Sequence, residues 1–223
     1  MVKLTTNQVQ FYKDYGYLQV SGIFTEQELA EMSQEYDRLF REHKPNMETK
    51  QGALISKADN EECSVLTVHN VEFHSRVFGK LLQNENLLDA LEGVMSTPDI
   101  LLHHTKAHSK PARNEAPYLM HQDYHYFPHK NVSMTAAVIH FDDAHPDNGG
   151  LCIYPRSHKL GPLKDVGTVE KGKAFHYMDP EEWPIEKATP VVAKRGDVVF
   201  FSYLTVHGSY SNLSDRVRRM LFI

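Results

Sequence analysis

Three residues of the sequence have the types and the spacing of a mononuclear metal site. His121 and Asp123 stand two positions apart in YLMHQDYHYF, a run with the apolar and aromatic character of a β-strand. In a strand, residues i and i+2 point to the same face, so the imidazole and the carboxylate converge while Gln122 faces away. A third ligand is needed, and the best later candidate is His207 in LTVHGSY, which follows the apolar strand DVVFFSYL.

Two histidines and one carboxylate on one face leave about three positions of an octahedral metal open. This facial triad is typical of non-haem Fe(II) oxygenases, whose open positions admit a co-substrate and O₂. Zinc also accepts such a set, although hydrolytic zinc sites more often have a helical spacing such as HExxH. In a chain with 14 histidines an HxD pair also arises by accident. The other histidines, notably His103, His104, His129 and His145, are expected on the surface or in loops.

The first third of the chain, which must support this site, is expected to be mainly helical. The predicted elements are, in order, a helix capped by Thr5 or Thr6 that stops at Gly16, a strand over 18–20, a helix opened by a Thr25–Glu28 capping box, a loop over 44–58, and a helix over 73–95 that breaks near Gly79.

From residue 100 onward, short apolar runs alternate with polar turns. Strands are predicted over 100–107, 118–127, 134–141, 151–155, 189–193, 197–203 and 217–223. The intervals are too short for βαβ crossovers, so the pattern favours a β-sandwich or barrel. Residues 156–188 are too long for a plain hairpin connection, and a loop of that length is a candidate lid.

The composition narrows the class of protein. With 24 basic and 29 acidic side chains the net charge is −5, which gives no support to nucleic-acid binding. No apolar run is long enough to cross a bilayer, and the N-terminus has no hydrophobic stretch typical of a secretory signal. Cys63 and Cys152 form no disulfide framework. We therefore expect a cytoplasmic protein that acts on a small molecule, without nucleic-acid or membrane partners; its oligomeric state stays open.

Three segments in the second half, HQDYHYFP, DDAHPDNGGLCIYPRSHKLGPL and KRGDVVFFSYLTVHGSYSNLSDRVRR, together resemble the phytanoyl-CoA dioxygenase family. The opening FYKDYGYLQVSGIFTEQEL is similar to that family's N-terminal helix–strand–helix, so the resemblance covers nearly the whole chain. It implies a mainly β fold, with a double-stranded β-helix (jelly-roll, cupin-like) core and N-terminal α-helices packed outside. We expect one oxygenase domain over 1–223, with a mainly helical part over 1–98 and the jelly-roll core over 99–223.

The resemblance also implies the cofactors and their residues. The triad becomes the set of Fe(II) ligands, and 2-oxoglutarate and O₂ are co-substrates, with decarboxylation to succinate and CO₂. The family's 2-oxoglutarate arginine lies eleven residues after the distal histidine, which here is Arg218. An arginine fork suits the far carboxylate of that co-substrate. Ser209 matches a serine that often assists, and Lys110 matches a lysine that contributes in some members.

Three arginines near the C-terminus compete for the co-substrate role. Arg216 and Arg218 would share one face of a regular strand, so alternation cannot choose between them. The eleven-residue offset selects Arg218, and Arg219 should face the opposite side.

Several details bear on the reaction and its substrate. Related halogenases lack the carboxylate of the triad, so a chain with Asp123 should hydroxylate or otherwise oxidise its substrate. His125 and Phe127 continue the inward face of the HxD strand and are expected either to line the substrate side or to be barrel core. The family turn Pro-Gly-Ser-His reads Pro-Arg-Ser-His here, with Arg156 in the glycine position.

Two other functions stay open. A cupin-like metal-dependent enzyme that does not use 2-oxoglutarate would need no counterpart of Arg218, and the segment NLSDRVRR argues against it. A non-catalytic jelly-roll binding protein should have lost a ligand, yet all three ligands of the triad are present.

Overall fold

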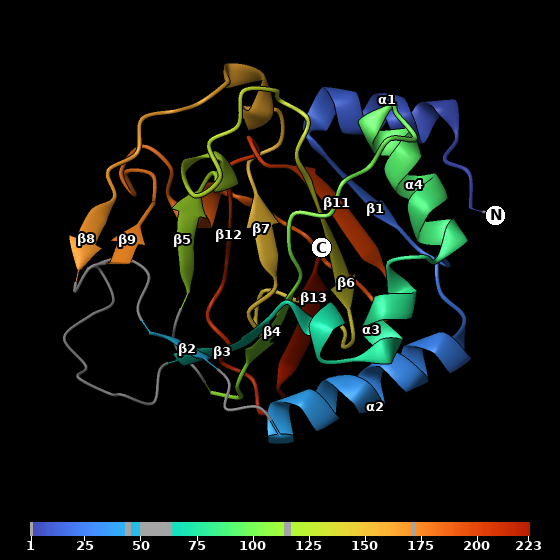
Figure 1. Ribbon diagram of the computed structural model, residues 1–223. Coiled ribbons are helices and arrows are strands. Elements are labelled where there is room, and N and C mark those ends of the chain that lie inside the picture. Colours follow the sequence, from blue (N-terminus) through green and yellow to red (C-terminus); the bar gives the residue numbers. More distant parts are fainter. Residues whose placement is uncertain (1, 43–45, 50–63, 114–116, 171–172) are drawn as a thin grey trace.

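A computed structural model describes residues 2–42, 46–49, 64–113, 117–170 and 173–223 (Figure 1). Within these ranges, the core consists of two antiparallel sheets, which confirms the predicted jelly-roll class. The larger sheet has seven strands in the order β1 (Tyr17–Val20), β11 (Val198–Ser202), β6 (Thr135–His140), β13 (Arg218–Phe222), β4 (Lys106–Lys110), β3 (Ser64–His69) and β2 (Asn46–Thr49). The smaller sheet has four, in the order β10 (Thr189–Pro190), β7 (Leu151–Ile153), β12 (His207–Ser209) and β5 (Tyr118–His121).

Strand β11 has buried apolar side chains on both faces of the larger sheet. Val198 and Phe200 belong to the hydrophobic cluster that the helices complete. Val199 and Phe201 point the other way, into a second cluster that also contains Leu151 of the smaller sheet. All four side chains are fully buried. A strand covered on both faces has no need of polar alternation, which explains the continuous apolar run in this part of the sequence.

Helices α1 (Thr6–Tyr15), α2 (Glu26–Glu42), α3 (Arg76–Leu81) and α4 (Glu85–Met95) cover the outer face of the larger sheet (Figure 1). The two predicted helix starts are confirmed by the capping contacts. The Thr5 hydroxyl accepts from the Gln8 amide at 3.3 Å, and the Thr25 hydroxyl accepts from the Glu28 amide at 3.2 Å. The first helix ends at Gly16, whose φ of 82° is left-handed, as expected.

Two predictions for the segment before the core were wrong. The expected helix over 73–95 is divided into a 3-10 helix (Val71–Phe73), α3 and α4. The break precedes α4, where the Asn84 side chain accepts from the Leu87 amide at 3.1 Å, and Gly79 lies inside α3. The predicted loop over 44–58 contains β2 over 46–49, and the rest of it lies outside the described residues.

Three predicted strands differ clearly from their expected bounds, and the one predicted over 189–193 is only β10 over Thr189–Pro190. Residues 100–105 are not in a strand, and β4 begins only at Lys106. The run 118–127 is a strand only as far as His121, and a 3-10 helix (Asp123–His125) follows. The long segment 156–188 contains two 3-10 helices (Ser157–Leu160 and Ile185–Lys187) and a hairpin of β8 (Thr168–Glu170) and β9 (Lys173–Phe175). Within the described ranges, no helix combines the length and the apolar character that crossing a membrane requires.

Candidate metal centre and its cavity

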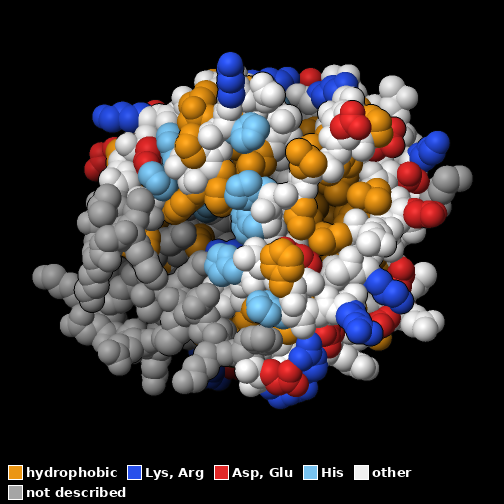
Figure 2. All heavy atoms as spheres, viewed as in Figure 1, with side chains coloured by type: hydrophobic (Ala, Val, Ile, Leu, Met, Phe, Trp, Pro, Cys, Tyr) orange, Lys and Arg blue, Asp and Glu red, His pale blue; other side chains and the backbone are white. Residues whose placement is uncertain are grey.

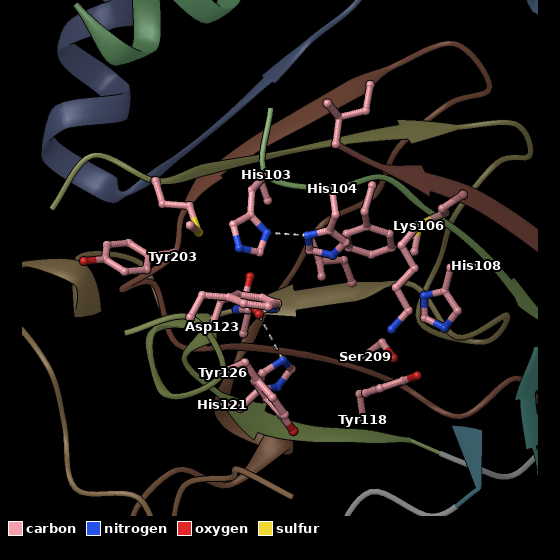
Figure 3. A pocket seen from close by; sticks show the side chains of 18 of the residues that line it. His103, His104, Lys106, His108, Tyr118, His121, Asp123, Tyr126, Tyr203 and Ser209 are labelled. Atoms are coloured by element: carbon pink, nitrogen blue, oxygen red, sulfur yellow. Dashed lines mark hydrogen bonds and ion pairs between the residues drawn. The ribbon is translucent and has the colours of Figure 1, made fainter. Parts of the chain in front are cut away.

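The three predicted ligands lie together where two strands of the smaller sheet meet. His121 ends β5 and His207 begins β12, and the two residues are directly opposite in the antiparallel register. Each Nε2 lies 3.7 Å from Oδ1 of Asp123, which opens the 3-10 helix after β5 (Figure 3). One ligand atom from each residue fits within 4.8 Å of the others. This donor set and its compactness fit a single metal ion with open coordination positions.

Backbone carbonyls fix the orientation of both imidazoles. Nδ1 of His121 bonds the Leu119 carbonyl oxygen at 2.8 Å, and Nδ1 of His207 bonds the Thr205 carbonyl oxygen at 2.9 Å. Since a carbonyl only accepts, each Nδ1 carries the hydrogen and each Nε2 presents a lone pair to the centre. Burial, together with the neighbouring His207, lowers the pKa of His121 to about 4. A neutral imidazole is the form that binds metal.

Gln122, between the two ligands, faces away from the centre as alternation predicts. Its amide nitrogen donates to the carbonyl oxygens of Leu204 at 2.6 Å and Gly161 at 3.0 Å, and its oxygen accepts from the Leu163 amide at 2.8 Å. The side chain is fully buried. It therefore anchors the turn that carries Asp123 to the start of the segment 156–188.

Gly208 lets the two ligand strands approach closely. A Cβ at this position would lie 2.6 Å from the Tyr118 carbonyl oxygen and 2.8 Å from the Met120 sulfur. Any larger residue would push β12 away from β5 and separate the two imidazoles.

The triad opens into a cavity of about 310 Å³ between the two sheets. Histidine side chains gather along the middle of the face in Figure 2. The cavity is lined by the three ligands together with His69, His103, His104, Lys106, His108, Tyr118, Tyr126, Phe127, Met134, Thr135, Ala136, Leu151, Tyr203, Gly208, Ser209, Arg218, Met220, Phe222 and Ile223. Asp123 is the sole carboxylate in this described lining, whereas several members are basic.

Arg218 is a buried cation without an ion-pair partner among the described residues. The side chain lines the cavity and is fully buried. Its Nη1 lies 3.2 Å from the Met220 sulfur, while Nε and Nη2 have no hydrogen-bond partner among the described residues. Burial lowers the pKa of this guanidinium to about 10. Leaving such a group unpaired is costly, and a bound carboxylate would satisfy both nitrogens.

Lys110 stands opposite Arg218 in the register of β4 and β13 and is also fully buried. Its Nζ donates to the Ser209 hydroxyl at 2.8 Å and to the Tyr210 carbonyl oxygen at 2.5 Å. Burial lowers the pKa of Lys110 well below its usual value, and Arg218 lowers it further. With its oxygen accepting from Lys110, the Ser209 hydroxyl can direct its own hydrogen into the cavity. The structure thus groups the three residues that the resemblance assigned to 2-oxoglutarate, and their chemistry fits a carboxylate.

The two other arginines have different surroundings. Arg219 points to the opposite face, as predicted, where its Nη2 and Nε meet the two Asp142 oxygens at 2.8 and 3.0 Å and its Nη1 meets Asp37 at 2.8 Å. Arg216 is exposed and precedes β13.

One expectation for the substrate side needs correction. His125 and Phe127 were expected to share a strand face, but the strand ends before them. His125 lies in the 3-10 helix, outside the described lining, with its ring 5.8 Å from that of His176. Phe127 does line the cavity. His103 and His104 lie in the loop before β4, as expected, and from there they also line the cavity.

The unusual Pro-Arg-Ser-His turn keeps the backbone conformation that glycine favours. Arg156 has a left-handed φ of 72°, and its guanidinium lies 4.8 Å from the centre of the Tyr15 ring. This contact offsets part of the cost of the conformation. None of the described cavity lining comes from 156–188, the segment predicted to be a lid.

The model of the phytanoyl-CoA dioxygenase (PhyH) family matches residues 12–220. A probable alpha-ketoglutarate-dependent hypophosphite dioxygenase of Stutzerimonas stutzeri is 27% identical, over 97% of this chain and 76% of its own length. The ectoine dioxygenase of Bordetella bronchiseptica is 25% identical, over 99% and 74%. The peroxisomal phytanoyl-CoA dioxygenase of Homo sapiens is 28% identical, over 98% and 67%.

Solved structures show the same fold. The epimerase SnoN, in complex with Fe³⁺, alpha ketoglutarate and nogalamycin RO, has a TM-score of 0.75 at 20% identity, covering 97% of this chain and 80% of its own. EctD from S. alaskensis, with 2-oxoglutarate and 5-hydroxyectoine, has a TM-score of 0.76 at 16% identity, covering 98% and 74%.

Proposed function

The chain belongs to the phytanoyl-CoA dioxygenase family, and on this premise we propose that it oxidises a small molecule at the centre formed by His121, Asp123 and His207. It is an iron- and 2-oxoglutarate-dependent dioxygenase. One observation carries the assignment of residues: a two-histidine, one-carboxylate set and a buried, unpaired arginine line the same cavity.

In this proposal the triad holds Fe(II) through one carboxylate oxygen and two Nε2 atoms. When bound, Fe(II), 2-oxoglutarate and O₂ together supply the oxidation of the substrate, with decarboxylation of 2-oxoglutarate to succinate and CO₂. The Nδ1–H bonds to Leu119 and Thr205 keep both rings aimed at the metal. Because the described part of the chain provides three ligands, about three positions would remain for the co-substrate and O₂.

Arg218 and Ser209 then bind the far carboxylate of 2-oxoglutarate. The guanidinium nitrogens Nε and Nη2 are the donors without a described partner, so they offer a two-pronged hydrogen bond. Lys110 acts as a positioning residue, because its Nζ orients the Ser209 hydroxyl and adds positive charge behind it. Phe127 contributes an apolar wall on the substrate side. For His125 the position outside the described lining supports a packing role.

The named relatives act on small molecules, ectoine and phytanoyl-CoA among them. We propose the same general class for this chain, without a nucleic-acid or membrane partner, and a cytoplasmic location. The buried, unpaired thiol of Cys152, which lies 3.9 Å from the Met120 sulfur, suits a reducing compartment. Fractionation of cells that express the tagged protein tests the location.

The decisive experiment asks whether the purified protein, reconstituted with Fe(II) in the presence of O₂, converts 2-oxoglutarate to succinate. We expect slow turnover without the true substrate, removed by a chelator and restored by Fe(II). If iron binds and no succinate forms under any substrate tested, the cupin-like alternative replaces the proposal. If iron does not bind, the non-catalytic alternative does.

A further inference from the structure

We propose that Tyr126 is a positioning residue that couples the metal centre to residues 161–167 and 175–178, which we call the brace, so that metal binding tightens the brace. The inference rests on the proposed function, because it assumes that His121 and Asp123 bind the metal. The brace contributes no described residue to the cavity lining. Any influence between the brace and the centre must therefore pass through residues that the brace contacts.

Tyr126 stands between the metal centre and the brace. Its ring lines the cavity beside the His121 imidazole (Figure 3), with the two rings at 88° and their centroids 6.0 Å apart. The Tyr126 hydroxyl accepts from the His176 amide at 3.0 Å and donates to the His176 carbonyl oxygen at 3.4 Å. The rings of Tyr126 and His176 also pack at right angles, with centroids 4.7 Å apart. A shift of His176 therefore moves the side chain that packs on a metal ligand.

Asp165 holds His176 in place and closes the brace. One carboxylate oxygen accepts from the Gly167 amide at 2.7 Å and from the Tyr177 amide at 3.0 Å, and the other bonds Nδ1 of His176. An ionised carboxylate only accepts, so Nδ1 of His176 carries the hydrogen. The Val166 amide also donates to the Tyr177 carbonyl oxygen at 2.9 Å. These contacts join the two arms of the brace into one unit.

The brace is attached before, between and after the two ligands of the HxD pair. The Met178 amide donates to the Met120 carbonyl oxygen at 2.7 Å, one residue before His121. The Gln122 side chain, which bonds the start of the brace, lies between His121 and Asp123. The tyrosine hydroxyl is the third attachment, and among the described contacts its side chain is the one that also packs on a ligand ring. Metal that orders the ligands should then restrain the brace, and by linkage a looser brace weakens metal binding by the same factor.

Zn(II) occupies the centre without turnover, so amide hydrogen exchange with and without Zn(II), resolved to single residues, tests the coupling. The amides of Gly167 and Tyr177 are the reporters, because both bond Asp165 and neither bonds Tyr126. We expect Zn(II) to slow their exchange about fivefold or more in the wild-type protein. Tyr126→Phe keeps the ring and removes the hydroxyl. It should reduce this slowing to less than about twofold and weaken Zn(II) binding by the factor that is lost.

The ratio of the exchange rates without and with Zn(II) separates coupling from a purely structural defect, which speeds exchange equally in both states. Tyr124→Phe is the matched control, since Tyr124 lies in the 3-10 helix just before Tyr126 and its hydroxyl has no described hydrogen bond. It should change neither the ratio nor the Zn(II) affinity. Asp123→Ala should abolish the slowing, which excludes an effect of Zn(II) bound to other histidines.

A second variant loosens the brace from its far end. Asp165→Ala should weaken Zn(II) binding and reduce the slowing at the Met178 amide, although Asp165 lies outside the described lining. It tests the coupling even if Tyr126→Phe does not fold, and thermal unfolding checks each variant.

Three results would overturn the inference: Zn(II) leaves the exchange of Gly167 and Tyr177 unchanged in the wild-type protein, Tyr126→Phe retains the full slowing, or Tyr124→Phe loses as much of it. Failure of the proposed function is a separate result, namely no succinate from the wild-type protein with Fe(II), and the exchange measurements with Zn(II) do not depend on it.

Discussion

The two sheets that enclose the cavity present different chemistry to it. The smaller sheet contributes the imidazoles of His121 and His207, whose orientation comes from carbonyl groups two residues earlier in the chain. The larger sheet contributes the guanidinium of Arg218, with Lys110 behind the cavity wall. A metal site requires aimed lone pairs, whereas an anion site requires positive charge that the protein does not neutralise. The smaller sheet therefore provides the metal ligands, and the larger sheet provides the positive charge.

The largest effect is expected on the smaller sheet. Asp123→Ala should abolish substrate oxidation and iron binding while the fold stays intact, because it deletes a ligand from a preformed site; His121→Ala and His207→Ala should behave likewise. Iron content, succinate release and circular dichroism provide the measurements, with the exposed Asp99→Ala as the control. Wild-type activity in an Asp123→Ala protein that contains iron would disprove the carboxylate assignment.

On the larger sheet, Arg218→Ala should raise the KM for 2-oxoglutarate by ~10²-fold, which corresponds to roughly 2–3 kcal/mol for a lost charge-assisted pair. The exposed Arg216 is the matched control, and Arg216→Ala should change this KM by less than about threefold. Steady-state kinetics at varied 2-oxoglutarate decide between them. A reversal of the two effects would mean that the co-substrate binds elsewhere.

A buried histidine of the larger sheet should make stability depend on pH. His140 is fully buried, and burial lowers its pKa from 6.5 to about 4. Between these values the unfolded chain binds the proton and the folded chain does not, so stability is complete above pH 6.5 and falls as the pH drops towards 4. His140→Gln should reduce this loss by on the order of 2 kcal/mol. Urea unfolding of both proteins at two pH values measures this loss. If the free energy of unfolding falls equally in the wild type and in His140→Gln, then His140 takes up its proton in the folded protein as easily as in the unfolded chain. The exposed His129→Gln is the control.

The outer face of β13 allows a smaller, purely structural test. Arg219→Ala should lower the free energy of unfolding by about 1–2 kcal/mol, since the lost contacts to Asp142 and Asp37 are only partly buried. The KM for 2-oxoglutarate should stay unchanged. A rise in that KM comparable with the effect of Arg218→Ala would contradict the assignment of the two faces.

The segment 156–188 should be the most mobile part of the chain and should close over bound substrate. Its contacts make the expectation more specific. The Leu163 amide donates to the Gln122 side chain at 2.8 Å and the Met178 amide to the Met120 carbonyl oxygen at 2.7 Å, so exchange should be slow at these two amides. Hydrogen exchange with and without ligand measures these rates. Slow exchange throughout the segment without ligand would contradict the prediction that it is a mobile lid.

The convergence of His121 and Asp123 could be predicted although β5 ends at His121, because Gln122 between them is still extended, with φ −109° and ψ 135°. Alternation also separated Arg218 from Arg219. The end of β5 at His121 could not be read in the same way, because the apolar and aromatic run continues through Phe127 and only the turn anchored by Gln122 interrupts it. For the same reason His125 was placed wrongly.

Contacts between distant segments were beyond the reach of local patterns. His103 and His104 line the cavity because β4, which follows them, pairs with β13 more than a hundred residues later. Asn84 rather than Gly79 sets the helix break because capping of α4 decides it. A composition of 14 histidines signals that some of them are functional, but only the fold separates those of the cavity from the rest.

The carbonyl groups that orient the two imidazoles have a consequence for how this enzyme tolerates change. In many metal sites the second hydrogen bond of a histidine comes from a side chain, which a single substitution removes. Here the acceptors at Leu119 and Thr205 are main-chain oxygens, so replacing either side chain leaves them in place. Substitutions at Leu119 or Thr205 therefore leave the orientation of the two imidazoles unchanged. Cavity residues such as Phe127 and Lys106 can also be replaced, so that new substrates fit, without misaligning the iron ligands.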